Sequence, residues 1–134
     1  MKYINAYLIF NGNCREAMQF YANNFGADLQ LSPFSDAPGT PGEAKDRIIH
    51  ARMTKGDSIL MASDNMPGMP YTQGNSYWVS VQCESLAEIE KLFSLFSDGG
   101  KVSMDLQDTF WNARFGMLTD RYGVNWMFNF EKGK

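Results

Sequence analysis

Two stretches of the chain repeat the same order of secondary-structure signals, and this repeat constrains the fold more than any other feature. In each stretch the signals predict a strand, a helix that ends at glycine, a second strand, and then two more strands joined by a glycine-containing turn. The predicted strands cover residues 3–10, 27–31, 47–54 and 58–63 in the first stretch, and 76–82, 101–106, 113–119 and 124–131 in the second. The sequence therefore predicts an α+β fold built from two βαβββ modules.

Both predicted helices begin with a capping signal and carry one apolar face. Asn13 precedes the first helix and Glu16 follows three residues later, and Ser85 and Glu88 have the same spacing before the second. This spacing lets two side chains satisfy the free N–H groups of a first helical turn. Apolar residues then recur at helical spacing, until Gly26 in the first helix and a double glycine in the second. We therefore expect two amphipathic helices.

Length and charge limit the number of domains and the kinds of partner. A chain of 134 residues suits a single domain. Within it, we assign about residues 1–64 to the first module, about 65–75 to a turn-rich linker and about 76–131 to the second module. The net charge is −3 and no run of like charge is present, and the apolar stretches are far shorter than the roughly 20 residues that cross a bilayer. We expect neither a nucleic-acid nor a membrane partner.

The N-terminal residues and the cysteines favour the cytoplasm. Residues 1–5 lead directly into a strand pattern, without the features of an export signal. The two cysteines, Cys14 and Cys83, have no CxxC spacing, so a reducing compartment is the simpler interpretation, with a single disulfide between them left open. Cys14 falls in the first turn of a predicted helix, where the helix dipole favours a reactive thiolate; a buried, unreactive thiol is the alternative.

A set of short motifs is spread over nearly the whole chain. They lie at residues 6–10, 16–21, 25–27, 48–52 and 60–64 and, toward the C-terminus, at Phe110-Trp111, Phe115-Gly116, Asp120, Gly123 and Trp126. In this combination the chain resembles the PhnB-like branch of the glyoxalase, bleomycin-resistance and extradiol-dioxygenase superfamily, also called the vicinal-oxygen-chelate superfamily. The resemblance implies two βαβββ modules that form a half-open curled sheet with the helices outside, around a cup for a small molecule. It also implies a homodimer.

The resemblance further implies four positions for metal ligands. In the metal enzymes of the superfamily these are His, Gln or Glu on the first, fourth, fifth and eighth strands. The corresponding residues here are Ala6, Met61, Tyr77 and Met127. None suits a borderline or hard divalent metal, and a shift of two residues along the last strand offers only Asn125 or Asn129. We therefore predict no metal ligand and no cofactor, with a divalent metal at a displaced site as the alternative.

Members of this branch often carry a demethylubiquinone methyltransferase label. That chemistry requires a methyl donor, but no glycine-rich loop of the kind that binds one follows the first predicted strand. The chain is also shorter than the usual fold for such a reaction. We therefore derive no methyl transfer from the label.

The last predicted strand alternates two kinds of side chain. Trp126 and Phe128 are expected to pack under the helices, while Met127 and Asn129 face a cavity. A polarisable sulfur and an amide suit an organic ligand. Met61 is expected to line the same cup as an apolar residue.

Three further side chains complete the predicted ligand contacts. Trp111 and Arg114 can clamp a planar or anionic ligand by stacking and by forked hydrogen bonds; the alternative is an aromatic anchor beside a surface arginine. Tyr77 can supply a hydroxyl to the cup, or it is a packing aromatic. The predicted ligand-binding set is therefore Met61, Tyr77, Trp111, Arg114, Met127 and Asn129.

His50 is the only histidine of the chain. It is a candidate acid or base because an imidazole exchanges protons around neutral pH. Tyr77 is the second candidate for this role. The alternative for His50 is a strand histidine that is hydrogen-bonded to a neighbour. The sequence thus predicts a protein that binds a small organic molecule in an apolar cup without the usual metal. The alternative is a metal-dependent or acid–base enzyme of the isomerase, lyase or dioxygenase type.

Overall fold

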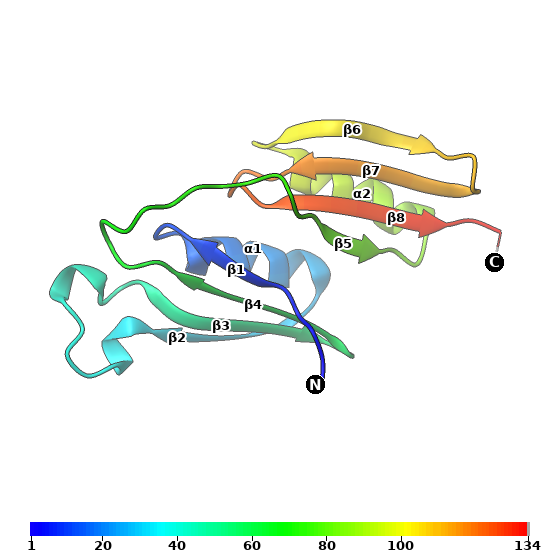
Figure 1. Cartoon of the computed structure of the whole chain (residues 1–134). Coiled ribbons are helices and arrows are strands. Elements are labelled where there is room, and N and C mark those ends of the chain that lie inside the picture. The colour runs from blue at the N-terminus through cyan, green and yellow to red at the C-terminus, as the bar shows by residue number, and fades with distance from the viewer. Residues whose placement is uncertain (134) are drawn as a thin grey trace. The chain divides into compact units, whose positions relative to one another are not determined.

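The repeat in the sequence corresponds to two separate four-stranded sheets, each with its own α-helix (Figure 1). The structure, a computed structural model, describes residues 1–133. These residues form two units, Met1–Tyr71 and the part of the chain from Thr72 onward. The predicted α+β fold with two βαβββ modules is confirmed, and neither sheet closes into a barrel.

The first unit contains five main elements. They are β1 (Tyr7–Phe10), α1 (Cys14–Phe25), β2 (Asp28–Pro33), β3 (Ile48–Lys55) and β4 (Ser58–Asp64). The strand order is β1-β4-β3-β2, with β1 parallel to β4 and the other pairs antiparallel. Two short 3₁₀ helices, η1 (Phe34–Asp36) and η2 (Gly42–Ala44), lie in the long connection between β2 and β3.

The second unit repeats this arrangement. Its elements are β5 (Val79–Gln82), α2 (Leu86–Ser97), β6 (Lys101–Asp108), β7 (Ala113–Thr119) and β8 (Asn125–Glu131). The strand order is β5-β8-β7-β6, again with a parallel first pair followed by antiparallel pairs. The strand order and directions of the first unit therefore recur in the second.

The strand register makes individual residues of the two units equivalent. One row of paired residues crosses each sheet: Tyr7, Met61, Arg52 and Gln30 in the first unit, and Ser80, Met127, Met117 and Met104 in the second. A second row lies two residues earlier on β3 and β7. It contains His50 in the first unit and Phe115 in the second. His50 pairs with Ser32, and Phe115 pairs with Gln107. We call the row through Met61 or Met127 the first row of its unit, and the row through His50 or Phe115 the second row.

The rows lie on the face of each sheet that is turned away from its helix, because the alternate residues form the core under the helix. In the second unit Trp126 and Phe128 of β8 are buried, and the ring of Phe96 on α2 contacts both, at centroid distances of 5.2 and 5.3 Å. The prediction that Trp126 and Phe128 pack under a helix is confirmed. In the first unit the corresponding core positions include the small residues Ala51 and Ala62, both fully buried.

The N-terminus of α2 is capped as predicted. The side-chain oxygen of Ser85 accepts a hydrogen bond from the Glu88 N–H at 3.0 Å. The carboxylate of Glu88 accepts in turn from the Glu84 N–H at 2.8 Å. Residues three or four apart therefore satisfy the first turn of this helix.

The N-terminus of α1 is capped differently, and the predicted role of Asn13 is wrong. Asn13 makes no side-chain capping hydrogen bond. Instead, Asp64 at the end of β4 accepts hydrogen bonds from the N–H groups of Gly12 and Cys14, at 2.9 and 3.0 Å, and from Ile48 at 2.8 Å. A carboxylate about 50 residues away along the chain therefore takes the donors that a local cap would have satisfied.

In residues 1–133, neither helix combines the length and the apolar character that a membrane span requires.

Candidate functional site

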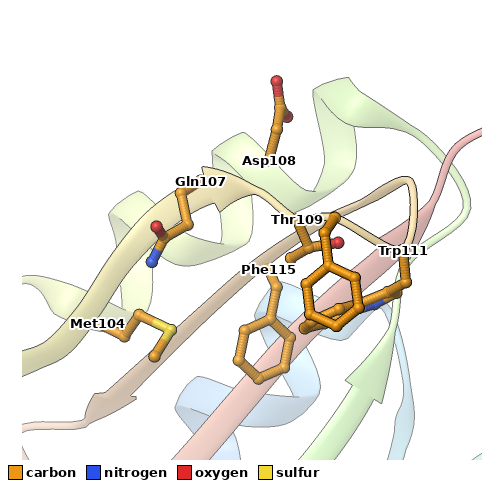
Figure 2. A pocket seen from close by; sticks show the side chains of 7 residues that line it. Met104, Gln107, Asp108, Thr109, Trp111 and Phe115 are labelled. Atoms are coloured by element: carbon orange, nitrogen blue, oxygen red, sulfur yellow. The ribbon is translucent and has the colours of Figure 1, made fainter.

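An open pocket of about 310 Å³ lies in the second unit at the end of the β6–β7 hairpin (Figure 2). Its lining residues come from β6, from the turn that follows it and from the start of β7. They are Met104, Gln107, Asp108, Thr109, Phe110, Trp111 and Phe115. Met104 and Phe115 belong to the two rows on the face away from α2, so this face carries the pocket.

The turn between β6 and β7 presents two aromatic side chains at its tip. Asn112 adopts a left-handed backbone conformation with φ 63°, which asparagine tolerates better than most residues. The hydroxyl and N–H of Thr109 both bind the carbonyl oxygen of Ala113, at 3.3 and 2.8 Å, and so close the turn. As a result Phe110 and Trp111 remain 96% and 53% exposed. Apolar side chains this exposed are available to a ligand.

Three aromatic rings follow one another along the pocket wall. The rings of Phe110 and Trp111 are 4.9 Å apart at an interplanar angle of 89°, and those of Trp111 and Phe115 are 6.2 Å apart at 65°. These edge-to-face contacts leave ring faces uncovered by the neighbouring ring. Figure 2 shows Trp111 and Phe115 side by side, with Met104 and Gln107 further along β6. The pocket thus combines ring faces, a thioether and one amide.

The polar groups of the pocket differ in how strongly they are already bound. Asp108 forms ion pairs with Lys132 and Arg114. The hydrogen bond from Lys132 lowers the pKa of Asp108, and the charge of Arg114 acts in the same direction. The side-chain amide of Gln107, by contrast, makes no hydrogen bond to the groups that the structure describes. Gln107 is therefore the polar group that a ligand can engage without breaking an existing contact.

Arg114 is held by two carboxylates, one of them on α2. Its guanidinium binds the carboxylate of Glu90 on α2 at 3.1 Å and that of Asp108 at 3.4 Å. It does not line the pocket, whereas Trp111 does. The structure therefore does not bring the two groups together as a clamp, and ligand binding by Arg114 stays a prediction.

The other predicted ligand contacts of this unit lie outside the pocket. Met127 and Asn129 are half-buried on the expected face of β8, and the Asn129 amide donates a hydrogen bond to Gln82 at 2.8 Å. Tyr77 precedes β5 instead of lying in it, and its carbonyl oxygen accepts a hydrogen bond from buried Asn125 at 3.3 Å. Ligand binding by these residues stays a prediction.

Sequence reasoning missed Met104, Gln107 and Phe115. Phe115 was visible as part of a family motif, but no signal assigned it to a pocket. Two register shifts interrupt the pairing of β6 with β7, between Val102 and Met104 and between Met104 and Gln107. Met104 and Gln107 therefore line one pocket although they are three residues apart, a spacing that strict alternation would place on opposite faces.

On the sheet of the first unit, His50 forms a hydrogen bond with Tyr7. The Tyr7 hydroxyl and the His50 Nδ1 are 3.0 Å apart, and the ring centroids are 5.7 Å apart. His50 is thus a strand histidine bound to a neighbour, one of its two expected interpretations, and a catalytic role for it stays a prediction. Tyr7 was missed because it lies 43 residues away along the chain.

The positions that correspond to the superfamily's metal ligands do not fit a hard or borderline divalent metal. Ala6 and Tyr77 lie outside β1 and β5, and the register instead places Tyr7 beside Met61 and Ser80 beside Met127. Two thioethers, a phenol and a hydroxyl replace the nitrogen and carboxylate donors that such metals prefer. Among the side chains that the structure describes, no group of three His, Cys, Asp or Glu residues could hold a metal ion.

The loop after β1 does not fit a methyl donor. It contains a single glycine, Gly12, and Asp64 already binds the N–H groups of Gly12 and Cys14 at the start of α1. These are the backbone donors that a cofactor at this helix terminus would use. No reaction step is therefore derived through a methyl donor.

Both cysteines are buried and free, so the expected alternative of a buried Cys14 thiol is confirmed. Burial raises the pKa of Cys14 to about 12, and the nearby charge of Asp64 raises it further, against a smaller opposite effect of Arg15. Burial likewise raises the pKa of Cys83 to about 12. Neither thiol is therefore a nucleophile near neutral pH.

Comparison with known proteins supports the family resemblance. Residues 2–128 match the family model described as 3-demethylubiquinone-9 3-methyltransferase. Protein PA1353 from Pseudomonas aeruginosa is 48% identical, with 98% of each chain covered and a TM-score of 0.90. The PhnB protein from Bacillus cereus is 27% identical over 96% of this chain and 99% of its own, with a TM-score of 0.79.

A more distant structure shows the fold alone. It is a glyoxalase/bleomycin resistance protein/dioxygenase family enzyme from Burkholderia phytofirmans PsJN, 14% identical over 94% of this chain and 96% of its own, with a TM-score of 0.65. The predicted glyoxalase-like fold is thereby confirmed.

Proposed function

The chain belongs to the PhnB-like family described as 3-demethylubiquinone-9 3-methyltransferase, within the glyoxalase-like superfamily, and on this premise we propose that it binds a small planar organic molecule in the pocket of its second unit. The observation that carries the proposal is the succession of accessible rings, Phe110, Trp111 and Phe115, beside the thioether of Met104. The proposal requires neither a metal nor a methyl donor.

The size of the pocket favours a small ligand. Its volume of about 310 Å³ is at the lower end of the range of about 300–1,000 Å³ that is typical of ligand sites. Aromatic contacts contribute about 0.5–1.5 kcal/mol each beyond the burial of apolar area. A ring system that contacts Trp111 and Phe115 together would therefore gain most of its affinity from these two side chains.

The polar groups favour an uncharged ligand with one hydrogen-bonding group. Asp108 is paired with Lys132 and Arg114, so its charge is already compensated. The amide of Gln107 can both donate and accept a hydrogen bond. It lies opposite Phe115 in the strand register, and so it can orient a ligand that rests on the ring.

Calorimetric titration of the full chain with 2-naphthol, a neutral bicyclic probe with one hydroxyl, tests this proposal. We expect saturable binding that weakens at least tenfold in Trp111→Ala and in Phe115→Ala, because each variant removes a ring face. Tyr3→Ala is the matched control, since Tyr3 is an exposed aromatic residue of the first unit. Equal affinity in the wild type and in Trp111→Ala, or no saturable binding, would contradict the proposal.

A further inference from the structure

The first unit carries polar side chains on the sheet face that corresponds to the pocket face of the second unit. In the first row, Tyr7 and Arg52 flank Met61, to which both are paired by register. His50, in the second row, is hydrogen-bonded to Tyr7. A phenol, an imidazole and a guanidinium thus lie around one thioether.

The spacing of the strands leaves room above Met61. Neighbouring strands lie about 4.8 Å apart, so the backbones of Tyr7 and Arg52, on either side of β4, are about 10 Å apart. His50 and Arg52 are two residues apart on one strand, about 7 Å at the backbone, and point to the same face. Met61 is half-buried between them. A planar molecule of a few atoms can rest on its sulfur and reach the polar groups.

Arg52 differs from the chain's other half-buried arginines in having no ion pair and no side-chain hydrogen bond among the described residues. Arg114 forms ion pairs, and the guanidinium of Arg47 donates hydrogen bonds to the backbone and side-chain carbonyl oxygens of Asn65. Arg52 is half-buried, and its register neighbours, Met61 and Gln30, carry no charge. Its guanidinium therefore offers its donors on this face to an anion from outside.

The equivalent positions of the second unit show that the fold itself does not require these groups. Met117 is equivalent to Arg52, Phe115 to His50 and Ser80 to Tyr7. A methionine, an aromatic ring and a small hydroxyl occupy these positions of the same sheet arrangement in the second unit. Sheet stability alone therefore does not explain the three polar side chains of the first unit.

We propose that Tyr7, His50 and Arg52 form a binding site for a small planar carboxylate above Met61. The guanidinium of Arg52 matches the two oxygens of a carboxylate in a forked pair. The hydrogen-bonded Tyr7 and His50 bind a further oxygen of the same molecule. Asp28, the acidic residue on this face among the described strands, pairs with Thr54, two residues from Arg52, and forms no ion pair with Arg52.

The single histidine provides a direct test. Proton NMR of the full chain resolves the ring signals of one histidine, and oxalate serves as the probe, titrated at constant ionic strength against sodium chloride. We expect a saturable shift of the His50 signals with oxalate but not with chloride. Arg52→Gln should weaken oxalate binding at least tenfold, and Tyr7→Phe severalfold, with unchanged circular dichroism.

Arg15→Gln is the matched control, because it removes the same charge from an exposed position on α1 of the same unit. Arg52→Lys should bind more weakly than the wild type but more tightly than Arg52→Gln, since lysine keeps the charge and loses the fork. A response that does not saturate, or that is the same in Arg52→Gln and Arg15→Gln, would overturn the proposal. Trp111→Ala should leave oxalate binding unchanged. The carboxylate site of the first unit and the aromatic pocket of the second unit are therefore tested independently.

Discussion

The two units share a strand order and a register, yet the sheet faces turned away from their helices have opposite chemistry. Arg52 and Met117 occupy one equivalent position, and His50 and Phe115 another. The core under each helix limits the residues that point into it, whereas residues on the other face are free of that constraint. The comparison teaches that a repeated backbone can hold two different sites, since the side chains that distinguish them contribute little to the core.

The cores under the helices also differ, but there the differences compensate for one another. Gly116 pairs with the large Phe128 in the second unit, where Ala51 pairs with Ala62 in the first. A Cβ atom at Gly116 would lie 2.6 Å from the ring of Phe93 on α2. The aromatic core of the second unit therefore depends on a missing side chain.

In each unit a buried carboxylate accepts hydrogen bonds from at least three donors. Asp64 binds three backbone N–H groups, and Asp120 binds those of Tyr122 and Val124, at 2.8 and 3.0 Å, together with the indole N–H of Trp126 at 2.9 Å. We predict that Asp64→Ala and Asp120→Ala each lower the free energy of unfolding by about 3 kcal/mol or more, because three buried donors lose their acceptor.

Urea unfolding measures this effect, with Asp105→Ala as the control on the exposed side of β6, where we expect a change within about 0.5 kcal/mol. A large effect in only one of the two buried variants would show that the units do not depend on their carboxylates in the same way.

Gly116→Ala gives the next largest effect. The added methyl group collides with Phe93 and Leu106, so we expect a loss of about 2 kcal/mol in the free energy of unfolding. Gly42→Ala is the control, since a Cβ there would meet no atom within 4 Å. Equal stability of the two variants in urea would mean that the core of the second unit repacks easily.

The cysteines, one in each unit, predict a loss of stability in alkali. Their pKa values are raised to about 12 in the folded chain from an ordinary value of 9.0, so the folded chain keeps protons that the unfolded chain releases. The stabilisation is complete below about pH 9 and is lost as the pH rises toward 12, by up to about 1.4 kcal/mol per pH unit for each thiol.

Cys14→Ala and Cys83→Ala should each remove part of this slope when urea unfolding is measured between pH 8.5 and about 10.5, a range set by these thiols. The double variant should show the flattest dependence, and all other titratable residues are the same in the four proteins. An unchanged slope in the double variant would rule out the thiols as its cause.

Helix capping gives the smallest predicted difference. Ser85→Ala should cost about 1 kcal/mol, because the Glu88 N–H loses its acceptor. Asn13→Ala should cost less than about 0.5 kcal/mol, because Asn13 makes no side-chain capping bond. Thermal unfolding of both variants compares them, and an equal loss would contradict the assignment of the α1 cap to Asp64.

Local signals in the sequence were sufficient for the element order. The left-handed Gly26 ends α1 as expected, the two-residue turn between Lys55 and Ser58 joins β3 to β4, and β7 covers the predicted residues 113–119. These features depend on neighbours along the chain. The period-two pattern also placed Trp126 and Phe128 correctly, because β8 has no register shift in its pairing with β7.

The candidate sites were less accessible to sequence reasoning. Trp111 was identified because an indole between two predicted strands can stack on a planar ligand, whereas Met104 and Gln107 were hidden by the irregular pairing of β6. The contact of Tyr7 with His50 and the cap provided by Asp64 join residues 43 and about 50 positions apart. Such contacts depend on which strands become neighbours in the sheet, and local sequence patterns do not predict strand neighbours.

The two capping arrangements have a consequence for the order in which the chain acquires structure. The cap of α2 is complete once Glu84 to Glu88 exist, so this helix can start from a local nucleus. The start of α1 must wait for Asp64, which leaves the ribosome about 50 residues after the helix begins. The N-terminal helix of the chain is thus synthesised first but stabilised late, when β4 joins β1 and closes the first sheet's long loop.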